Sequence, residues 1–275
     1  MIAMAGWGVG DFVVARAVRK TDPLTVLVWS QMIGLIPYFP ILLLSDSFKI
    51  PSGDAILLVF TSALMVTLAY FSLYKGLQVG KVSLITPISA CWTIVTVILS
   101  SIFLGESLSL IQFLAVILAI TGGVIASFKW GEARTSFRAG AVGLRYAFIA
   151  MMCLGIYYVF LDVLVSELSW FMPILLIRLF TVTYLFTYTL TTQNSISFPK
   201  EVALLVILIG LLEFIAFFSY GIGINSEYTA IVAPISATSP VVTIMLAQLL
   251  LGESLDTNQK VGVVAVLIAL ILLFL

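Results

Sequence analysis

The chain has 275 residues, of which 62% are hydrophobic and 9% are charged, whereas soluble domains of average composition carry about 25% charged residues. Thirteen Lys and Arg balance thirteen Asp and Glu, so there is no net basic field for nucleic acid and no acidic tail. Histidine is absent, which excludes His-based zinc sites, His-activated nucleophiles and His proton relays.

Apolar runs long enough to cross a membrane follow one another along the whole chain. About 20 residues in a helix span the roughly 30 Å of hydrocarbon in a bilayer. Ten such runs are found, at 1–18, 24–44, 55–78, 82–104, 108–128, 140–162, 169–191, 201–224, 228–251 and 257–275. The sequence therefore predicts an all-α polytopic membrane protein with ten transmembrane helices.

An internal repeat divides these runs into two sets of five. A shift of 147 residues places 87–112 on 234–259 with 13 of 26 positions identical, including the Leu-Gly-Glu-Ser-Leu segments at 104–108 and 251–255. The longest polar stretch, 129–139, is the expected linker between the halves 1–128 and 140–275. Because five is odd, the second half should enter the membrane from the opposite side, which predicts an inverted repeat.

The first run carries an acidic residue after a series of glycines. Gly6, Gly8 and Gly10 permit close helix approach or local unwinding, and Asp11 follows them. A charge within the membrane is costly and hence a functional candidate. The alternative is an Asp11 near the interface, paired with Arg16 or Lys75.

Aromatic residues with polar tips recur in the third, fourth and sixth runs. They are Tyr70, Tyr74, Trp92, Tyr157 and Tyr158. Such side chains can line a cavity and select flat or apolar substrates. For each of them alone, a place facing lipid or in the interfacial belt is the alternative.

Arg178 and Glu213 lie at similar depths in the seventh and eighth runs and can pair. In a functional interpretation Glu213 is a titrating carboxylate, or Arg178 anchors a substrate carboxylate. The alternative is a static buried ion pair that fixes helix packing.

Prolines and glycines mark possible hinges and helix ends. Pro87 and Pro234 lie early in the fourth and ninth runs, and Pro240 adds a second break in the ninth, so a hinge or gate is one interpretation and an ordinary helix-start proline the other. The pairs Gly105-Glu106 and Gly252-Glu253 are interpreted as structural, because Gly ends one helix and Glu accepts hydrogen bonds at the start of the next.

The Trp7-Gly8 pair, a proline in the fourth run and the duplicated Leu-Gly-Glu-Ser-Leu segment resemble the drug/metabolite transporter superfamily, specifically the EamA-type ten-helix permeases. The resemblance implies export or exchange of small metabolites, such as amino acids, by alternating access around a central cavity in the plasma or inner membrane. The expected substrate pathway comprises Trp7, Gly8, Gly10, Asp11, Tyr70, Tyr74, Trp92, Tyr157, Tyr158, Arg178 and Glu213.

Other functions fit less well. No HExxH motif, Ser-His pair or Walker loop is present, so no catalytic residue, cofactor or metal is expected. Without an ATP motif, transport should use a gradient, with protons as the candidate coupling ion. A channel-like or non-transporting scaffold protein is the alternative. The expected partners are a small-molecule substrate and the lipid bilayer, without nucleic acid, and the chain itself is expected to be a monomer or a weak homodimer.

Two lines of reasoning give opposite orientations of the chain in the membrane. If each loop is numbered by the run that it follows, the Lys and Arg residues outside the runs or near their ends lie at odd-numbered loops. Lys49 is the exception and lies in an even-numbered loop. The positive-inside rule therefore places both termini outside the cell, but the family resemblance implies cytoplasmic termini.

Overall fold

The computed structural model describes residues 1–44, 51–79, 85, 88–105, 108–127, 141–192, 197–251 and 256–272. Within these ranges all regular structure is helical. The helices are α1 (Ile2–Ala17), α2 (Pro23–Leu35), α3 (Tyr38–Leu44), α4 (Gly53–Val79), α6 (Trp92–Phe103), α7 (Leu110–Ser127), α9 (Ala141–Leu168), α10 (Phe171–Thr191), η1 (Lys200–Val202), α11 (Ala203–Ser226), α12 (Thr229–Ala237), α13 (Ser239–Leu251) and α14 (Thr257–Leu272). The predicted linker at 129–139 lies outside the described residues.

Every predicted run contains helix, and the prediction of an all-α polytopic membrane protein is confirmed. In the described part of the chain, five helical segments are long and apolar enough to cross a membrane: Pro23–Leu44, Gly53–Val79, Gly143–Leu168, Phe171–Thr191 and Lys200–Ser226. The other apolar helices are shorter, so the number ten stays a prediction.

The helices differ from the predicted runs at several places. The second run is interrupted between Leu35 and Tyr38, at Pro37, whose missing N–H removes a hydrogen bond from the helix. The sixth run was expected to end at residue 162, but α9 continues to Leu168. The ninth run is divided into α12 and α13 by a break at Thr238.

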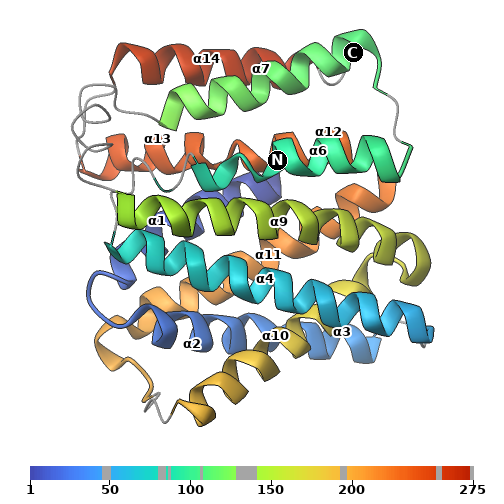
Figure 1. Ribbon diagram of the computed structural model, residues 1–275. Coiled ribbons are helices and arrows are strands. Elements are labelled where there is room, and N and C mark those ends of the chain that lie inside the picture. The colour runs from blue at the N-terminus through green and yellow to red at the C-terminus, as the bar shows by residue number, and fades with distance from the viewer. Residues whose placement is uncertain are drawn as a thin grey trace.

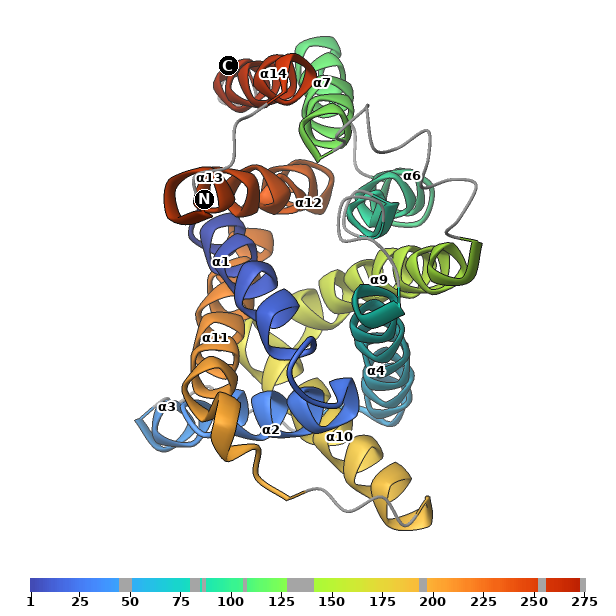
Figure 2. The ribbon, with the colours of Figure 1, turned by 90° about the vertical axis from the view of Figure 1, so that its left-hand side faces the viewer.

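The helices lie roughly along one common direction in successive layers (Figure 1). Helices α7 and α14 pack against each other at one end of the bundle, α6, α12 and α13 follow, and α2 and α10 lie at the opposite end (Figures 1 and 2). Large apolar side chains such as Leu57, Phe113, Leu204 and Leu249 are exposed on the outside. Lipid tails would cover such a surface in a membrane.

Local signals account for several helix ends. The side chain of Asp22 caps α2 by accepting a hydrogen bond of 3.0 Å from the backbone N–H of Thr25, and Pro23 occupies the first turn, where its missing N–H costs nothing. Gly105 follows α6 with a φ of +67°. Glycine adopts this left-handed conformation readily, and the last residue of α6 is Phe103, two positions before Gly105.

Replacing Asp22 by alanine should lower the free energy of unfolding by about 1 kcal/mol, because the first turn of α2 loses its cap. Equilibrium unfolding of the detergent-solubilised protein measures this change. Asp22→Asn is the matched control and should stay close to wild type, since asparagine caps helices equally well. Equal losses in both variants would mean that the charge of Asp22, and not the cap, stabilises the helix.

The crossing of α1 and α13 depends on a glycine. The backbones of α1 and α13 approach so closely at Gly8 that a Cβ atom added there would lie 2.5 Å from the Cβ of Val242 and 2.6 Å from the carbonyl oxygen of Ser239. The hydroxyl of Thr243 on α13 donates a hydrogen bond of 2.8 Å to the carbonyl oxygen of Gly8. Gly8 thus serves close approach of the two backbones, and α1 stays helical throughout.

The crossing of α9 and α6 repeats this arrangement. A Cβ atom added to Gly155 would overlap Val95 and lie 3.0 Å from the carbonyl oxygen of Trp92. The hydroxyl of Thr96 donates a hydrogen bond of 3.2 Å to the carbonyl oxygen of Gly155. The participants of the two crossings are 147 residues apart, and they pair as Gly8 with Gly155, Val242 with Val95, Ser239 with Trp92 and Thr243 with Thr96.

Candidate functional site

A cavity of about 60 Å³ lies in the middle of the bundle. Its walls come from α1, α4, α9, α12, the first residue of α6, the first residue of α13 and the helical turn at 88–90. The lining residues are Trp7, Asp11, Tyr70, Leu73, Ser89, Ala90, Trp92, Leu154, Tyr158, Ser236, Ala237 and Ser239. Five residues of the predicted substrate pathway, Trp7, Asp11, Tyr70, Trp92 and Tyr158, are therefore brought together here.

Both halves of the chain contribute to the lining. Ten of the twelve lining residues form five pairs that are 147 residues apart. The pairs are Trp7 with Leu154, Asp11 with Tyr158, Ser89 with Ser236, Ala90 with Ala237, and Trp92 with Ser239. Equivalent positions of the two halves thus face one shared space.

Aromatic rings form much of the wall. The rings of Trp92 and Tyr158 are stacked with their centroids 4.0 Å apart. Trp7 meets Tyr158 edge to face at 5.9 Å. Tyr70 completes the aromatic part of the lining.

Several polar atoms at the cavity lack a partner among the residues that the structure describes. Among the described residues, the Asp11 carboxylate makes no hydrogen bond and no ion pair. The expected alternative, a pairing with Arg16 or Lys75, is not found in the same ranges: the Lys75 ammonium contacts the Gln78 side chain at 2.8 Å. The buried Nε1 of Trp7 and Oγ of Ser89 are also without a hydrogen-bond partner there. These atoms are available to a bound molecule.

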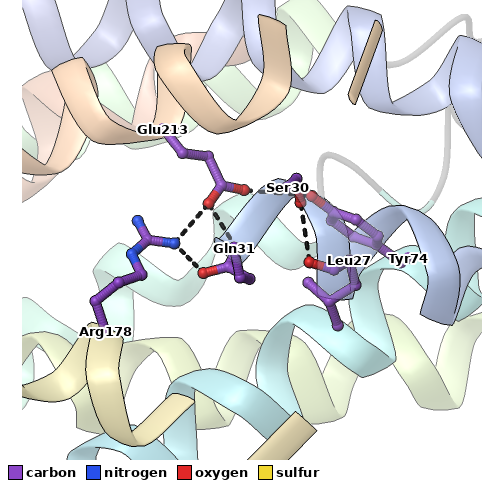
Figure 3. Close-up of polar contacts among 6 residues, drawn as sticks. All are labelled: Leu27, Ser30, Gln31, Tyr74, Arg178 and Glu213. Atoms are coloured by element: carbon purple, nitrogen blue, oxygen red, sulfur yellow. Dashed lines mark hydrogen bonds and ion pairs between the residues drawn. The ribbon is translucent and has the colours of Figure 1, made fainter. Parts of the chain in front are cut away.

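A buried polar cluster lies elsewhere in the bundle, where α2, α4, α10 and α11 meet (Figure 3). Arg178 and Glu213, which were predicted to lie close enough to pair, form an ion pair of 2.9 Å, and each is only 5% exposed. Gln31 donates a hydrogen bond of 2.6 Å to Glu213 and accepts one from Arg178. The Tyr74 hydroxyl contacts the second carboxylate oxygen of Glu213 at 3.2 Å. Both charges are thus satisfied inside the protein.

Two aromatic rings connect the cavity with this cluster. Tyr70 lines the cavity, and its ring centroid lies 6.4 Å from that of Phe217. The guanidinium of Arg178 lies 5.0 Å from the centre of the Phe217 ring. Tyr70 and Phe217 are 147 residues apart, as are Gln31 and Arg178, so at both places equivalent positions of the two halves touch each other.

The remaining predicted residues lie away from the cavity lining. Gly8 faces α13, and a Cβ atom added to Gly10 would meet only the Leu212 Cβ, at 4.0 Å. Tyr74 and Glu213 belong to the polar cluster. Tyr157 and Arg178 line a second, smaller pocket, which Tyr70 also borders.

The predicted hinge prolines are placed only in part. Pro234 lies inside α12, which continues through it. Pro240 is the second residue of α13, two positions after the break at Thr238. Pro87, Glu106, Gly252 and Glu253 lie outside the described residues.

Sequence reasoning missed Gln31, Ser89, Ser236 and Ser239. None of them is charged or aromatic, so none stood out within an apolar run. The repeat contains the missing signal, because Gln31 is the equivalent of Arg178, and Ser236 and Ser239 are the equivalents of Ser89 and Trp92.

Comparison with known proteins agrees with this architecture. The chain is 24% identical to an "Uncharacterized transporter" of Archaeoglobus fulgidus over 98% of its own length and 94% of that protein. It is also 32% identical to an uncharacterized protein of Methanocaldococcus jannaschii over 123 residues, which are 45% of this chain but 89% of that protein. A crystal structure with 14% sequence identity superposes with a TM-score of 0.77, covering 100% of this chain and 98% of the other, and shows the same fold.

A family model described as the EamA-like transporter family matches residues 1–128 and again residues 141–275. The two matches together span nearly the whole length. The chain therefore belongs to the EamA-like transporter family and is a multi-pass membrane protein.

Proposed function

We propose that the protein is a secondary transporter that exports or exchanges small organic metabolites, such as amino acids, across the plasma or inner membrane by alternating access. The observation that carries this proposal is the cavity whose lining consists mostly of five residue pairs 147 positions apart. A site to which both halves contribute equivalent positions can be opened to either side when the halves exchange their conformations.

Ten transmembrane helices in two inverted repeats provide the mechanical basis for alternating access. Inverted repeats are related by a pseudo-twofold axis in the plane of the membrane, and their substrate sites lie near the bilayer midplane. The contacts Tyr70–Phe217 and Gln31–Arg178 join equivalent positions, as expected for residues beside such an axis. The Methanocaldococcus jannaschii relative, with little more length than its matched 123 residues, supports treating each half as one unit.

The two polar regions have separate roles in this proposal. The Arg178–Glu213 pair is nearly fully buried and fully partnered, and it fixes α10, α11 and α2 against one another. This favours the static ion pair over an anchor for a substrate carboxylate. Asp11, which lines the cavity and has no partner in the described part of the chain, is the carboxylate that meets the transported molecule or a coupled proton.

Transport into proteoliposomes tests the proposal. Purified protein should take up at least one member of a labelled panel of amino acids and biogenic amines, and Asp11→Asn should lower that uptake at least tenfold. Asp54→Asn is the matched control, because Asp54 is exposed at the start of α4, and it should transport normally. Faster uptake under a pH gradient would identify protons as the coupling ion. No uptake of any panel member would contradict the proposal and favour the scaffold alternative.

A further inference from the structure

We propose that the cavity binds a cationic amine, and that the Asp11 carboxylate pairs with a primary or methylated ammonium group inside a box formed by Trp7, Tyr70, Trp92 and Tyr158. This inference rests on the proposed function, since it names the chemical class of the molecule that the cavity receives. It commits to a positive charge, which membership of the family does not specify.

The first argument is the unbalanced charge. Asp11 is the one carboxylate among the residues that line the cavity, and none of these residues is Lys or Arg. An unpaired carboxylate away from water is costly, and a cation removes that cost. The nearby guanidinium of Arg178 is not available, because it is bound to Glu213 and Gln31 beyond the ring of Phe217.

The second argument is the aromatic lining. Cations are attracted to the faces of aromatic rings, most strongly to tryptophan, and cages of such rings recognise quaternary ammonium groups. Trp92 and Tyr158 form a stacked pair at 4.0 Å on one wall, while Trp7 and Tyr70 supply further rings. A neutral apolar group would gain from the rings but would leave Asp11 unpaired, and an anion would be repelled.

The size of the cavity and its remaining polar atoms fit such a ligand. A volume of about 60 Å³ exceeds the roughly 10–15 Å³ that one water molecule needs. The cavity therefore has room for an ammonium group. The unpartnered Nε1 of Trp7 and Oγ of Ser89 suit a hydroxyl or carbonyl oxygen carried next to the ammonium group.

Binding of two isosteric probes tests the charge requirement. Choline and 3,3-dimethyl-1-butanol have nearly the same shape but differ by one positive charge. In isothermal titration calorimetry on the detergent-purified full chain, choline should bind with a Kd at least tenfold lower than that of 3,3-dimethyl-1-butanol. Asp11→Asn should abolish this difference, Asp11→Glu should keep part of it, and Asp54→Asn should leave it unchanged.

The aromatic box is tested with Trp92. Trp92→Leu should raise the Kd for choline at least threefold, whereas Trp92→Phe, which keeps an aromatic face, should restore most of the affinity. Monodisperse elution and a wild-type melting temperature show that each variant is folded. If Asp11→Asn does not fold, the reduced choline preference expected of Asp11→Glu tests the role of Asp11 in its place.

Equal binding of the two probes by the wild-type protein, or a choline preference that survives in Asp11→Asn, would overturn the inference. Transport of a neutral or anionic metabolite without any choline preference would do the same but leave the proposed function intact. Charge-selective binding in a protein that transports nothing would instead overturn the proposed function alone.

Discussion

Replacing Arg178 by methionine should lower the free energy of unfolding by about 3–5 kcal/mol, the usual result of removing one partner from a buried ion pair. The carboxylate of Glu213 would remain buried, with only Gln31 and Tyr74 to hold it. Glu213→Met should cost a similar amount, because it leaves the guanidinium of Arg178 uncompensated. Equilibrium unfolding of the detergent-solubilised variants measures both losses.

The double variant separates the contribution of the ion pair from the cost of leaving one charge unpaired. Arg178→Met combined with Glu213→Met removes both charges, so it should be more stable than either single variant. Full recovery is not expected, since buried Gln31 loses two partners. Arg145→Met is the matched control: Arg145 is exposed, and its loss should change stability by about 0.5 kcal/mol or less. Single variants as stable as the wild type would refute the static role given to the pair.

Gly8→Ala should destabilise the protein by about 1–3 kcal/mol, the typical cost of inserting a methyl group into a packed contact. The new Cβ would lie 2.6 Å from the carbonyl oxygen of Ser239, which is backbone and cannot rotate away, so α1 and α13 must separate. Gly155→Ala should have a comparable effect on α9 and α6. Thermal unfolding in detergent and proteoliposome uptake check both variants.

Gly10→Ala is the control within the same helix. Its Cβ would meet only the Leu212 Cβ, at 4.0 Å, which is an ordinary contact. Alanine favours helix over glycine by about 0.5–1 kcal/mol, so this variant should be as stable as the wild type or more so. Equal losses at Gly8 and Gly10 would contradict the close crossing at Gly8.

The positions of the helices could be predicted from the sequence, because hydrocarbon requires long apolar runs and satisfied backbones. The break at Pro37 could have been found by the same reasoning, since proline removes a helix hydrogen bond, but the apolar run around it concealed the interruption. The continuation of α9 beyond residue 162 had no clear signal, because the charged residues Asp162 and Glu167 interrupt the apolar sequence there. In the structure Asp162 accepts a hydrogen bond of 2.7 Å from Thr229.

Much of the site could also be predicted, because charges and polar aromatics in an apolar run are unusual enough to be noticed. Asp11, Trp92 and Tyr158 were found in this way, and they share one cavity. Which helix faces meet could not be derived from the residues alone. A soluble helix reveals its buried face by alternating apolar and polar residues, but a helix that faces lipid on its other side is apolar all round, so the contact of Gln31 with Glu213 left no such pattern.

Solute counterflow tests alternating access most directly. Proteoliposomes are loaded with a high concentration of the unlabelled panel member that is transported fastest, and a trace of the labelled compound is added outside. An alternating-access carrier should accumulate the label transiently above its external concentration, because export of the internal unlabelled compound keeps returning the cavity to its outward-facing state. Asp11→Asn should remove this overshoot. Label that only equilibrates, with no overshoot in the wild-type protein, would contradict alternating access and indicate a channel.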